Sequence, residues 1–173
     1  AERLFSGRSS RSVGMDELVR ETGLGKATVY RLFPSKDVLV GGYLQRLADE
    51  ILGLIDRQAG QAPSPVAALH GLLDAVEADV RRPGFRGCAF HNAGSEYDDP
   101  AHPARVVARE YRVALLARLS GLVDRAAGRP ELAGQLATLI DGAYTSAAHL
   151  GPDGPAAAGT ALAHALVDGL DAN

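Results

Sequence analysis

Apolar residues recur at intervals of three and four along most of the chain, which is the period of helices that bury one face. No stretch alternates convincingly between apolar and polar positions, as a half-buried strand would. The pattern therefore predicts an all-α fold. The stripes behind this prediction are Leu44, Leu47, Ile51, Leu54 and Gln58; Val66, Leu69, Leu73, Val76 and Val80; Val107, Tyr111, Leu115, Leu119 and Leu122; Leu132, Leu136, Leu139 and Ala143; and Ala158, Leu162, Leu166 and Leu170.

Proline and glycine mark the ends of these stripes, because neither residue continues a helix well. Ser35 is the predicted N-cap of the first long helix, since its hydroxyl can accept a hydrogen bond from a free backbone N–H group. A shorter segment, GCAFHNAGSEY, lies between two of the breaks. The breaks fall at APSP (62–65), PG (83–84), the DDPAHP corner (98–103), GRP (128–130) and the stretch 151–155.

Shorter elements precede the long helices. Residues 1–6 are predicted to end a helix whose apolar residues are Leu4 and Phe5. Gly7 stops this helix, and the polar stretch RSSRS follows as a loop.

Two short helices then follow, at about 15–22 and 26–32, and Pro34 ends the second. Gly23 lies between them and can adopt the positive φ of a tight helix end. Two short helices joined by a glycine turn, with a third helix before them, form a helix-turn-helix. Its predicted core residues are Leu18, Val19, Val29 and Leu32.

The other face of the helix at 26–32 is then available to enter a major groove. Lys26 can reach a guanine or a phosphate, and the methyl group of Thr28 can contact a thymine. Tyr30 can donate to a phosphate, and so can Lys36 at the positive dipole end of the next helix. The predicted DNA-binding residues are Ser12, Lys26, Ala27, Thr28, Tyr30, Arg31 and Lys36.

Charge is distributed unevenly, and the only two lysines, Lys26 and Lys36, both lie in this motif. Residues 1–36 contain seven basic and four acidic residues, a net charge of +3. The remaining 137 residues contain 11 basic and 17 acidic residues, a net charge of −6. A basic segment followed by an acidic one is typical of a phosphate-binding module attached to a body that does not bind nucleic acid.

Composition narrows the class of protein. The chain has 173 residues, of which 46% are hydrophobic and 23% charged, as in an ordinary globular protein. It has no apolar run of about 18 residues, no signal-peptide pattern and one cysteine, so we expect no membrane span, no internal disulfide and a cytoplasmic location. Met15 is the only methionine. We therefore expect the natural chain to begin earlier, with the start of the first helix missing.

The run LFSGRSSRSVGMDELVRETGLGKATVYRLFPSKDVLV resembles the DNA-binding domain of TetR-family transcriptional regulators. The resemblance covers about 40 residues: a Leu-Phe helix end, a glycine two residues later, a polar loop, and the series of Lys26, Thr28, Tyr30, Phe33 and Lys36. The family usually has Ser or Thr at the position of Gly25, so this chain lacks one capping side chain and one expected phosphate contact. The segment RGCAFHNAGSEYDDPAHPARVVAREYR at 86–112 also resembles members of the family.

The resemblance implies a TetR-like fold with a helix-turn-helix DNA-binding domain at 1–42 and a helical effector-binding and dimerisation domain at 43–173. It implies a repressor that a small-molecule effector releases from a palindromic double-stranded DNA operator. It also implies a homodimer through the last two helices, in which the alanine-rich stretch 155–166 forms a dimer seam instead of packing alone. We expect no cofactor, no metal and no enzymatic activity.

Polar side chains concentrate at 87–102, and an apolar pocket with a few polar groups is the usual ligand site. We expect effector contacts from Cys88, His91, Asn92, Glu96, Tyr97, Tyr111 and Tyr144. An alternative function remains open, in which the segment with Cys88, His91 and Glu96 serves a helical cofactor- or metal-binding bundle or an enzyme. The paired CxxC and HxxxH spacings of strong metal motifs are absent. Two interpretations of Cys88 also remain open: it is a redox sensor, or it is a small buried apolar residue.

Overall fold

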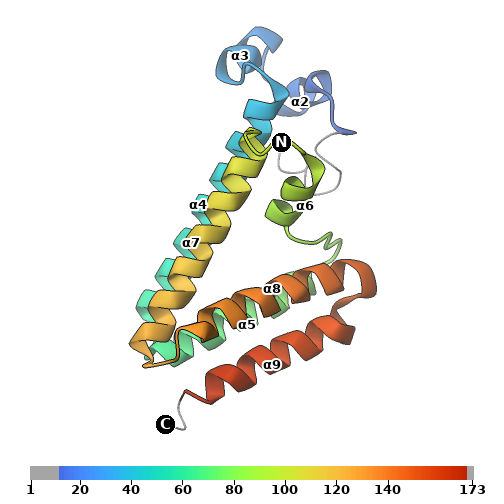
Figure 1. The fold of residues 1–173 in the computed structure, drawn as a ribbon. Coiled ribbons are helices and arrows are strands. Elements are labelled where there is room, and N and C mark those ends of the chain that lie inside the picture. The colour runs from blue at the N-terminus through green and yellow to red at the C-terminus, as the bar shows by residue number, and fades with distance from the viewer. Residues whose placement is uncertain (1–11, 171–173) are drawn as a thin grey trace. The chain divides into compact units, whose positions relative to one another are not determined.

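The computed structural model describes residues 12–170, and this part of the chain is helical and contains no strand (Figure 1). The predicted all-α fold is confirmed. The predicted helix end with Leu4, Phe5 and Gly7 lies outside the described residues, as does most of the polar loop. The elements are α2 (Met15–Thr22), α3 (Lys26–Leu32), α4 (Lys36–Gln61), α5 (Pro65–Val80), α6 (Ala89–Glu96), α7 (Pro103–Arg125), α8 (Glu131–Leu150), the short turn η2 (Pro152–Ala156) and α9 (Ala157–Asp168).

The chain divides into two compact units. Among the described residues, the first unit comprises 12–50 and 88–111, and the second comprises 51–87 and 112–170. The long helices α4 and α7 contribute to both units. The first unit therefore contains α6 and the start of α7 in addition to α2 and α3.

A small apolar core holds the N-terminal helices of the first unit together. Val13, Leu18 and Leu39 are buried there, and Met15 and Phe33 pack against them. Fully burying an aliphatic side chain of this size contributes about 1.5–3 kcal/mol. These contacts join α2 and the end of α3 to the first turns of α4.

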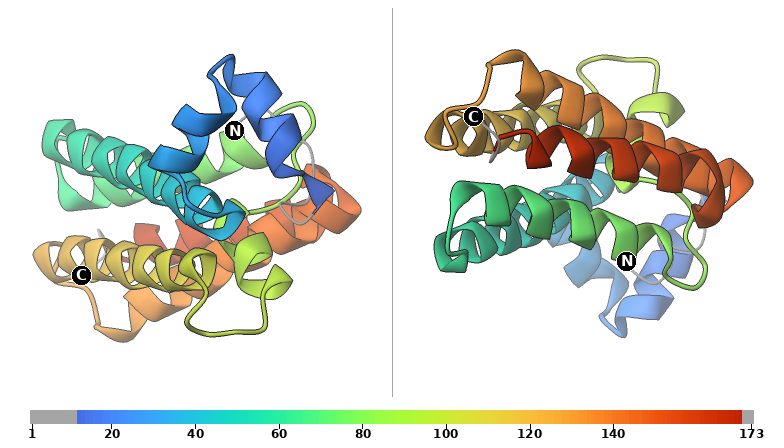
Figure 2. Two further views of the ribbon diagram at one scale, coloured as in Figure 1. Left: turned by 90° about the horizontal axis from the view of Figure 1, so that it is seen from above. Right: turned by 90° about the horizontal axis from the view of Figure 1, so that it is seen from below.

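The second unit is built around α5, α8 and α9, which pack against one another (Figures 1 and 2). Ser64 caps α5, its Oγ accepting a hydrogen bond from the Ala67 N–H at 3.1 Å, and Pro65 occupies the first turn. The predicted stripe of α5 is buried as expected: Val66, Leu69, Leu73, Val76 and Val80.

Helix α9 buries a different face from the one that its large residues indicate. Thr160, Ala163 and Val167 pack inward, whereas Leu162 is 52% exposed. Most inward positions carry alanine or threonine, so the bulkier leucine stripe does not mark the inner face. Leu166 and Leu170 of this stripe are half-buried in the single chain, so Leu162 is its exposed leucine. Leu54, from the predicted stripe of α4, is likewise exposed.

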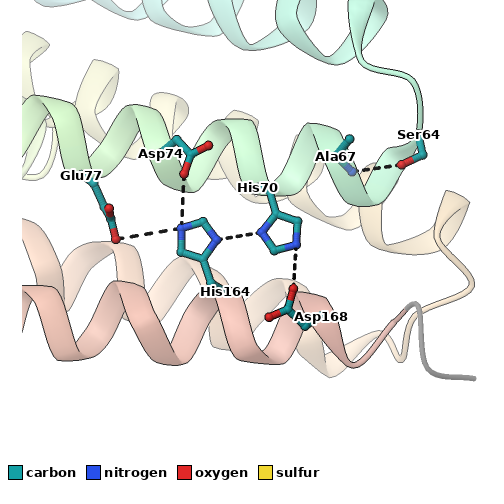
Figure 3. A network of polar contacts seen from close by, with 7 residues as sticks. All are labelled: Ser64, Ala67, His70, Asp74, Glu77, His164 and Asp168. Atoms are coloured by element: carbon teal, nitrogen blue, oxygen red, sulfur yellow. Dashed lines mark hydrogen bonds and ion pairs between the residues drawn. The ribbon is translucent and has the colours of Figure 1, made fainter.

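Polar side chains link α5 and α9 (Figure 3). The Nδ1 atoms of His70 and His164 are 2.7 Å apart, too close for stacked rings, so the two rings meet edge to edge. The Nε2 atom of His70 lies 3.1 Å from Asp168, and that of His164 lies 3.5 Å from Asp74. Each helix thus contributes one histidine and, four residues later, the aspartate that faces the other helix's histidine.

Candidate nucleic-acid interface

The turn between α2 and α3 has the backbone that the sequence predicted. Gly23 has φ +66°, and its N–H donates to the Arg20 carbonyl at 3.3 Å. Only glycine adopts this left-handed conformation at little cost. Gly25 then begins α3 without a side-chain cap, and its carbonyl accepts from the N–H groups of Thr28 and Val29.

One side of α3 is anchored and the other is exposed. Val29 is 2% exposed, as predicted, but the prediction that Leu32 belongs to the core is wrong, since Leu32 is 56% exposed. Phe33 takes its place. It follows Val29 by four residues and packs against the core of Val13, Leu18 and Leu39. It also lies beside Gly42, where any Cβ would come within 3.4 Å of its ring.

The predicted DNA-binding residues lie mostly on accessible surface. Ser12, Lys26, Ala27, Tyr30 and Arg31 are exposed. Thr28 and Lys36 are half-buried. Lys36 is the first residue of α4, directly after Ser35, whose Oγ accepts from the Val38 N–H at 3.2 Å as predicted for an N-cap.

Lys26 has an ion-pair partner that the sequence analysis did not identify. Its Nζ lies 2.8 Å from Oδ1 of Asp16, in the first turn of α2, and 5.9 Å from the centre of the Tyr30 ring. The hydrogen bond from Lys26 lowers the pKa of Asp16, and the same bond raises the pKa of Lys26. Ten residues separate the pair in sequence, so only the packing of two helices reveals it.

The first unit also contains most of the predicted effector-binding residues. Tyr97 and Tyr111 are buried, and Cys88 and Glu96 are half-buried. Tyr111 stacks on Phe90 with ring centres 3.7 Å apart, and Tyr97 stacks on His102 at 3.6 Å. Tyr97 and Tyr111 therefore each belong to an aromatic pair around α6 and the start of α7.

His91 and Asn92, two of the expected effector contacts, are exposed. Phe90 and Ala93 take the buried side of α6. Because successive helical residues are about 100° apart, residues 91 and 92 then face outward. Tyr144 belongs to the second unit, where its hydroxyl donates to Asp79 at 2.9 Å.

The corner before α7 contacts the first turns of α4. The Nε2 atom of His102 lies 3.3 Å from Oδ1 of Asp37, and the His102 side chain is only 11% exposed. A Cβ on Gly41 would come within 2.8 Å of Pro103, so the two helices approach closely at this point. Asp37 directly follows Lys36. The α6–α7 segment is thus packed beside the residues that follow α3.

No group of three or more His, Cys, Asp or Glu side chains between residues 12 and 170 is arranged to hold a metal ion. None of the helices described above combines the length and apolar character that crossing a membrane requires.

Residues 1–42 match the family model described as bacterial regulatory proteins of the tetR family. Two uncharacterised HTH-type transcriptional regulators, from two strains of Mycobacterium tuberculosis, are each 44% identical to this chain over 46 residues. The match spans 27% of this chain and only 23% of the length of each relative. The sequence similarity to these relatives is therefore local.

Two solved structures resemble nearly the whole chain. A TetR-family transcriptional regulator from Streptomyces coelicolor has a TM-score of 0.90 and 28% identity, and the match covers 98% of this chain and 91% of that one. A protein described as a TetR-type transcriptional regulator from Streptomyces avermitilis has a TM-score of 0.76 and 26% identity, over 99% and 98% of the two chains. The likeness thus extends well beyond residues 1–42.

Proposed function

We propose that this chain, which belongs to the TetR family of transcriptional regulators, is a homodimeric repressor that a small molecule releases from a palindromic DNA operator. The observation that supports DNA binding most directly is the exposed face of α3. It presents Lys26, Tyr30 and Arg31 to solvent, while Val29 anchors the opposite side. A short, well-anchored helix with basic and hydroxyl groups on its free face suits the major groove.

Each side chain of this face has a defined task in the proposal. Lys26 donates to guanine O6 or N7, and the Thr28 methyl group contacts a thymine. Tyr30, Lys36 and Ser12 donate to phosphates, which fixes the position of α3 along the duplex. Arg31, one turn after Ala27, adds a further cation on the same face.

A dimer is needed because one short helix reads only a few base pairs. We propose that the dimer forms through α8 and α9, where Leu162 is an exposed large apolar side chain in an otherwise alanine-rich helix. Small residues allow two helices to approach closely, and the leucines would then fill the seam. A two-fold axis would present two α3 helices to two half-sites about one helical turn, ~34–36 Å, apart.

The effector is proposed to be a small, partly apolar molecule that contacts residues of α6 and the start of α7 in the first unit. Aromatic walls and a few polar groups suit such a ligand. It acts only if its affinity differs between DNA-bound and released forms, because equal affinity shifts no population. The contacts of His102 with Asp37 and of Pro103 with Gly41 support a link from this segment to α4. The proposed contacts are Cys88, His91, Asn92, Glu96, Tyr97 and Tyr111, whereas Tyr144 belongs to the second unit.

DNA binding is tested by selecting duplexes from a random-sequence library with the wild-type protein and footprinting the enriched sequence. The expected result is a near-palindrome with two protected half-sites. Enrichment of no sequence, or protection of a single unpaired half-site, would contradict the dimeric operator-binding proposal.

The effector is tested separately by measuring the melting temperature of the wild-type protein across a library of small molecules. A ligand that binds only the folded state raises this temperature. Ligands found in this way should also release the selected duplex, and Glu96→Gln should weaken both effects. If Glu96→Gln and His91→Ala left ligand affinity and DNA release unchanged, the proposed effector contacts would be wrong, while DNA binding would still stand.

A further inference from the structure

We propose that Asp16 determines the sequence selectivity of DNA binding, by keeping Lys26 available for a base contact and withholding it from phosphates. The inference rests on the proposed function, in which α3 enters the major groove. It adds to the proposed DNA-binding surface an acidic residue of α2, whose charge is opposite to that of the surface. A carboxylate would not bind DNA directly.

The geometry joins three exposed side chains at the start of α3. Lys26 Nζ lies 2.8 Å from Asp16, and the two side chains are 63% and 77% exposed. The same ammonium lies 5.9 Å from the centre of the exposed Tyr30 ring. Lys26 therefore has a preferred position above the first turn of α3, although the whole group faces solvent.

The donor count of lysine allows a base contact without loss of this ion pair. An ammonium group has three N–H donors and no acceptor. One donor points at Asp16, and the other two remain for guanine O6 and N7. Asp16 would then orient Lys26 during base recognition, as a positioning residue.

A phosphate contact by Lys26 is disfavoured for the same reason. If Lys26 moved to a phosphate, the Asp16 carboxylate would lose its cation beside a polyanion. The ion pair as a whole has no net charge, so it releases few counterions on binding to arbitrary DNA. Repulsion of the wrong partner is an effective source of selectivity, because selectivity is a difference between two affinities.

The test compares Asp16→Asn, Lys26→Ala and the double variant with wild type. The matched control is Asp49→Asn, which makes the same charge change on α4, where Asp49 accepts a hydrogen bond from Gln45. Affinities are measured by fluorescence anisotropy over a series of KCl concentrations. The probes are a duplex enriched from the random library by wild type and a shuffled duplex of equal length and composition. Thermal melting followed by circular dichroism verifies that each variant is folded.

Asp16→Asn should bind the shuffled duplex about tenfold more tightly, with a salt slope steeper by about one per protomer. Its affinity for the selected duplex should change less, so the ratio of the two affinities falls. Lys26→Ala should also lower this ratio, and adding Asp16→Asn to it should lower the ratio no further. Asp49→Asn should keep the wild-type ratio.

Two results would overturn the inference: an unchanged affinity ratio and salt slope in Asp16→Asn, or an equal loss of selectivity from Asp16→Asn with and without Lys26. Failure of the proposed function gives a different result, in which wild type enriches no duplex at all.

Discussion

Lys36 is the residue whose removal tests phosphate binding most simply. It begins α4, whose positive dipole end also favours a phosphate. We expect Lys36→Ala to weaken binding to selected and shuffled duplexes alike and to reduce the salt slope by about one per protomer. Fluorescence anisotropy over a KCl series measures both quantities. Lys36→Arg should retain most of the binding.

The contrast with Asp16 makes this prediction specific. Replacing Lys36 should change the affinity for DNA without changing the selectivity, whereas replacing Asp16 should change the selectivity. Wild-type affinity of Lys36→Ala at every salt concentration would contradict a phosphate contact.

The backbone conformation or burial of a single residue was predictable from the sequence where local geometry determines it. Gly23 adopts the positive φ that the turn requires, and Val29 is buried by helical spacing. Leu32 and Phe33 could not be separated in this way. Both are apolar and near the end of α3, and the choice between them depends on Gly42 and the core of the first unit. The Asp16–Lys26 pair likewise depends on how α2 packs against α3.

At the scale of elements, helix ends were predicted well because their signals are local hydrogen bonds. Ser35, the predicted N-cap of α4, accepts a hydrogen bond from an N–H group three residues later. Ser64, within the predicted APSP break, does the same at the start of α5. The buried faces were predicted well only where large and small residues differ, as in α5. In α9 the inward positions are Thr160, Ala163 and Val167, so side-chain size does not identify the face that packs.

The contact between α4 and α7 in the second unit predicts a pH dependence of stability. Arg118 donates from Nε and Nη2 to the two carboxylate oxygens of Asp56, both at 2.7 Å. This hydrogen bonding lowers the pKa of Asp56 below its ordinary value of 3.8. A lowered folded-state pKa stabilises the fold above the unfolded-state pKa, and this contribution is lost as the pH falls through the lowered value.

Asp56→Asn should therefore lower the free energy of unfolding at neutral pH by up to ~1 kcal/mol, the range for an ion pair at the surface. The difference from wild type should shrink as the pH falls below 3.8. Urea denaturation at a series of pH values measures it, with Asp124→Asn, an exposed carboxylate of α7, as the control. A difference that stayed constant into acid would contradict the role of ionised Asp56.

The histidine pair between α5 and α9 predicts a coupling energy. One Nδ1 atom must donate and the other accept at 2.7 Å, so each ring depends on the other. We expect His70→Ala and His164→Ala each to lower the free energy of unfolding by about 1 kcal/mol and the double variant to lower it by less than the sum. Chemical denaturation of the four proteins measures the coupling. His149→Ala, on the exposed end of α8, is the control, and additive effects would contradict the bond.

At the scale of the whole molecule, the proposed repressor depends on pairing two chains, and Leu162 offers the cleanest test. It is 52% exposed in the single chain, so replacing it should leave the fold of the protomer intact. In the proposed dimer, Leu162→Arg would bury a charge against the second copy, which is costly without a partner. Because two half-sites are bound together only by a dimer, the variant should also lose affinity for the selected palindrome.

We therefore expect Leu162→Arg to be a folded monomer by multi-angle light scattering and circular dichroism, with weakened binding to the palindrome and little change on a single half-site. Val113→Arg adds the same charge at a 64% exposed position of α7 and should remain dimeric. A folded Leu162→Arg that was still a dimer would exclude this face of α9 from the interface. Loss of the dimer with undiminished binding to the palindrome would instead separate operator recognition from pairing through α9.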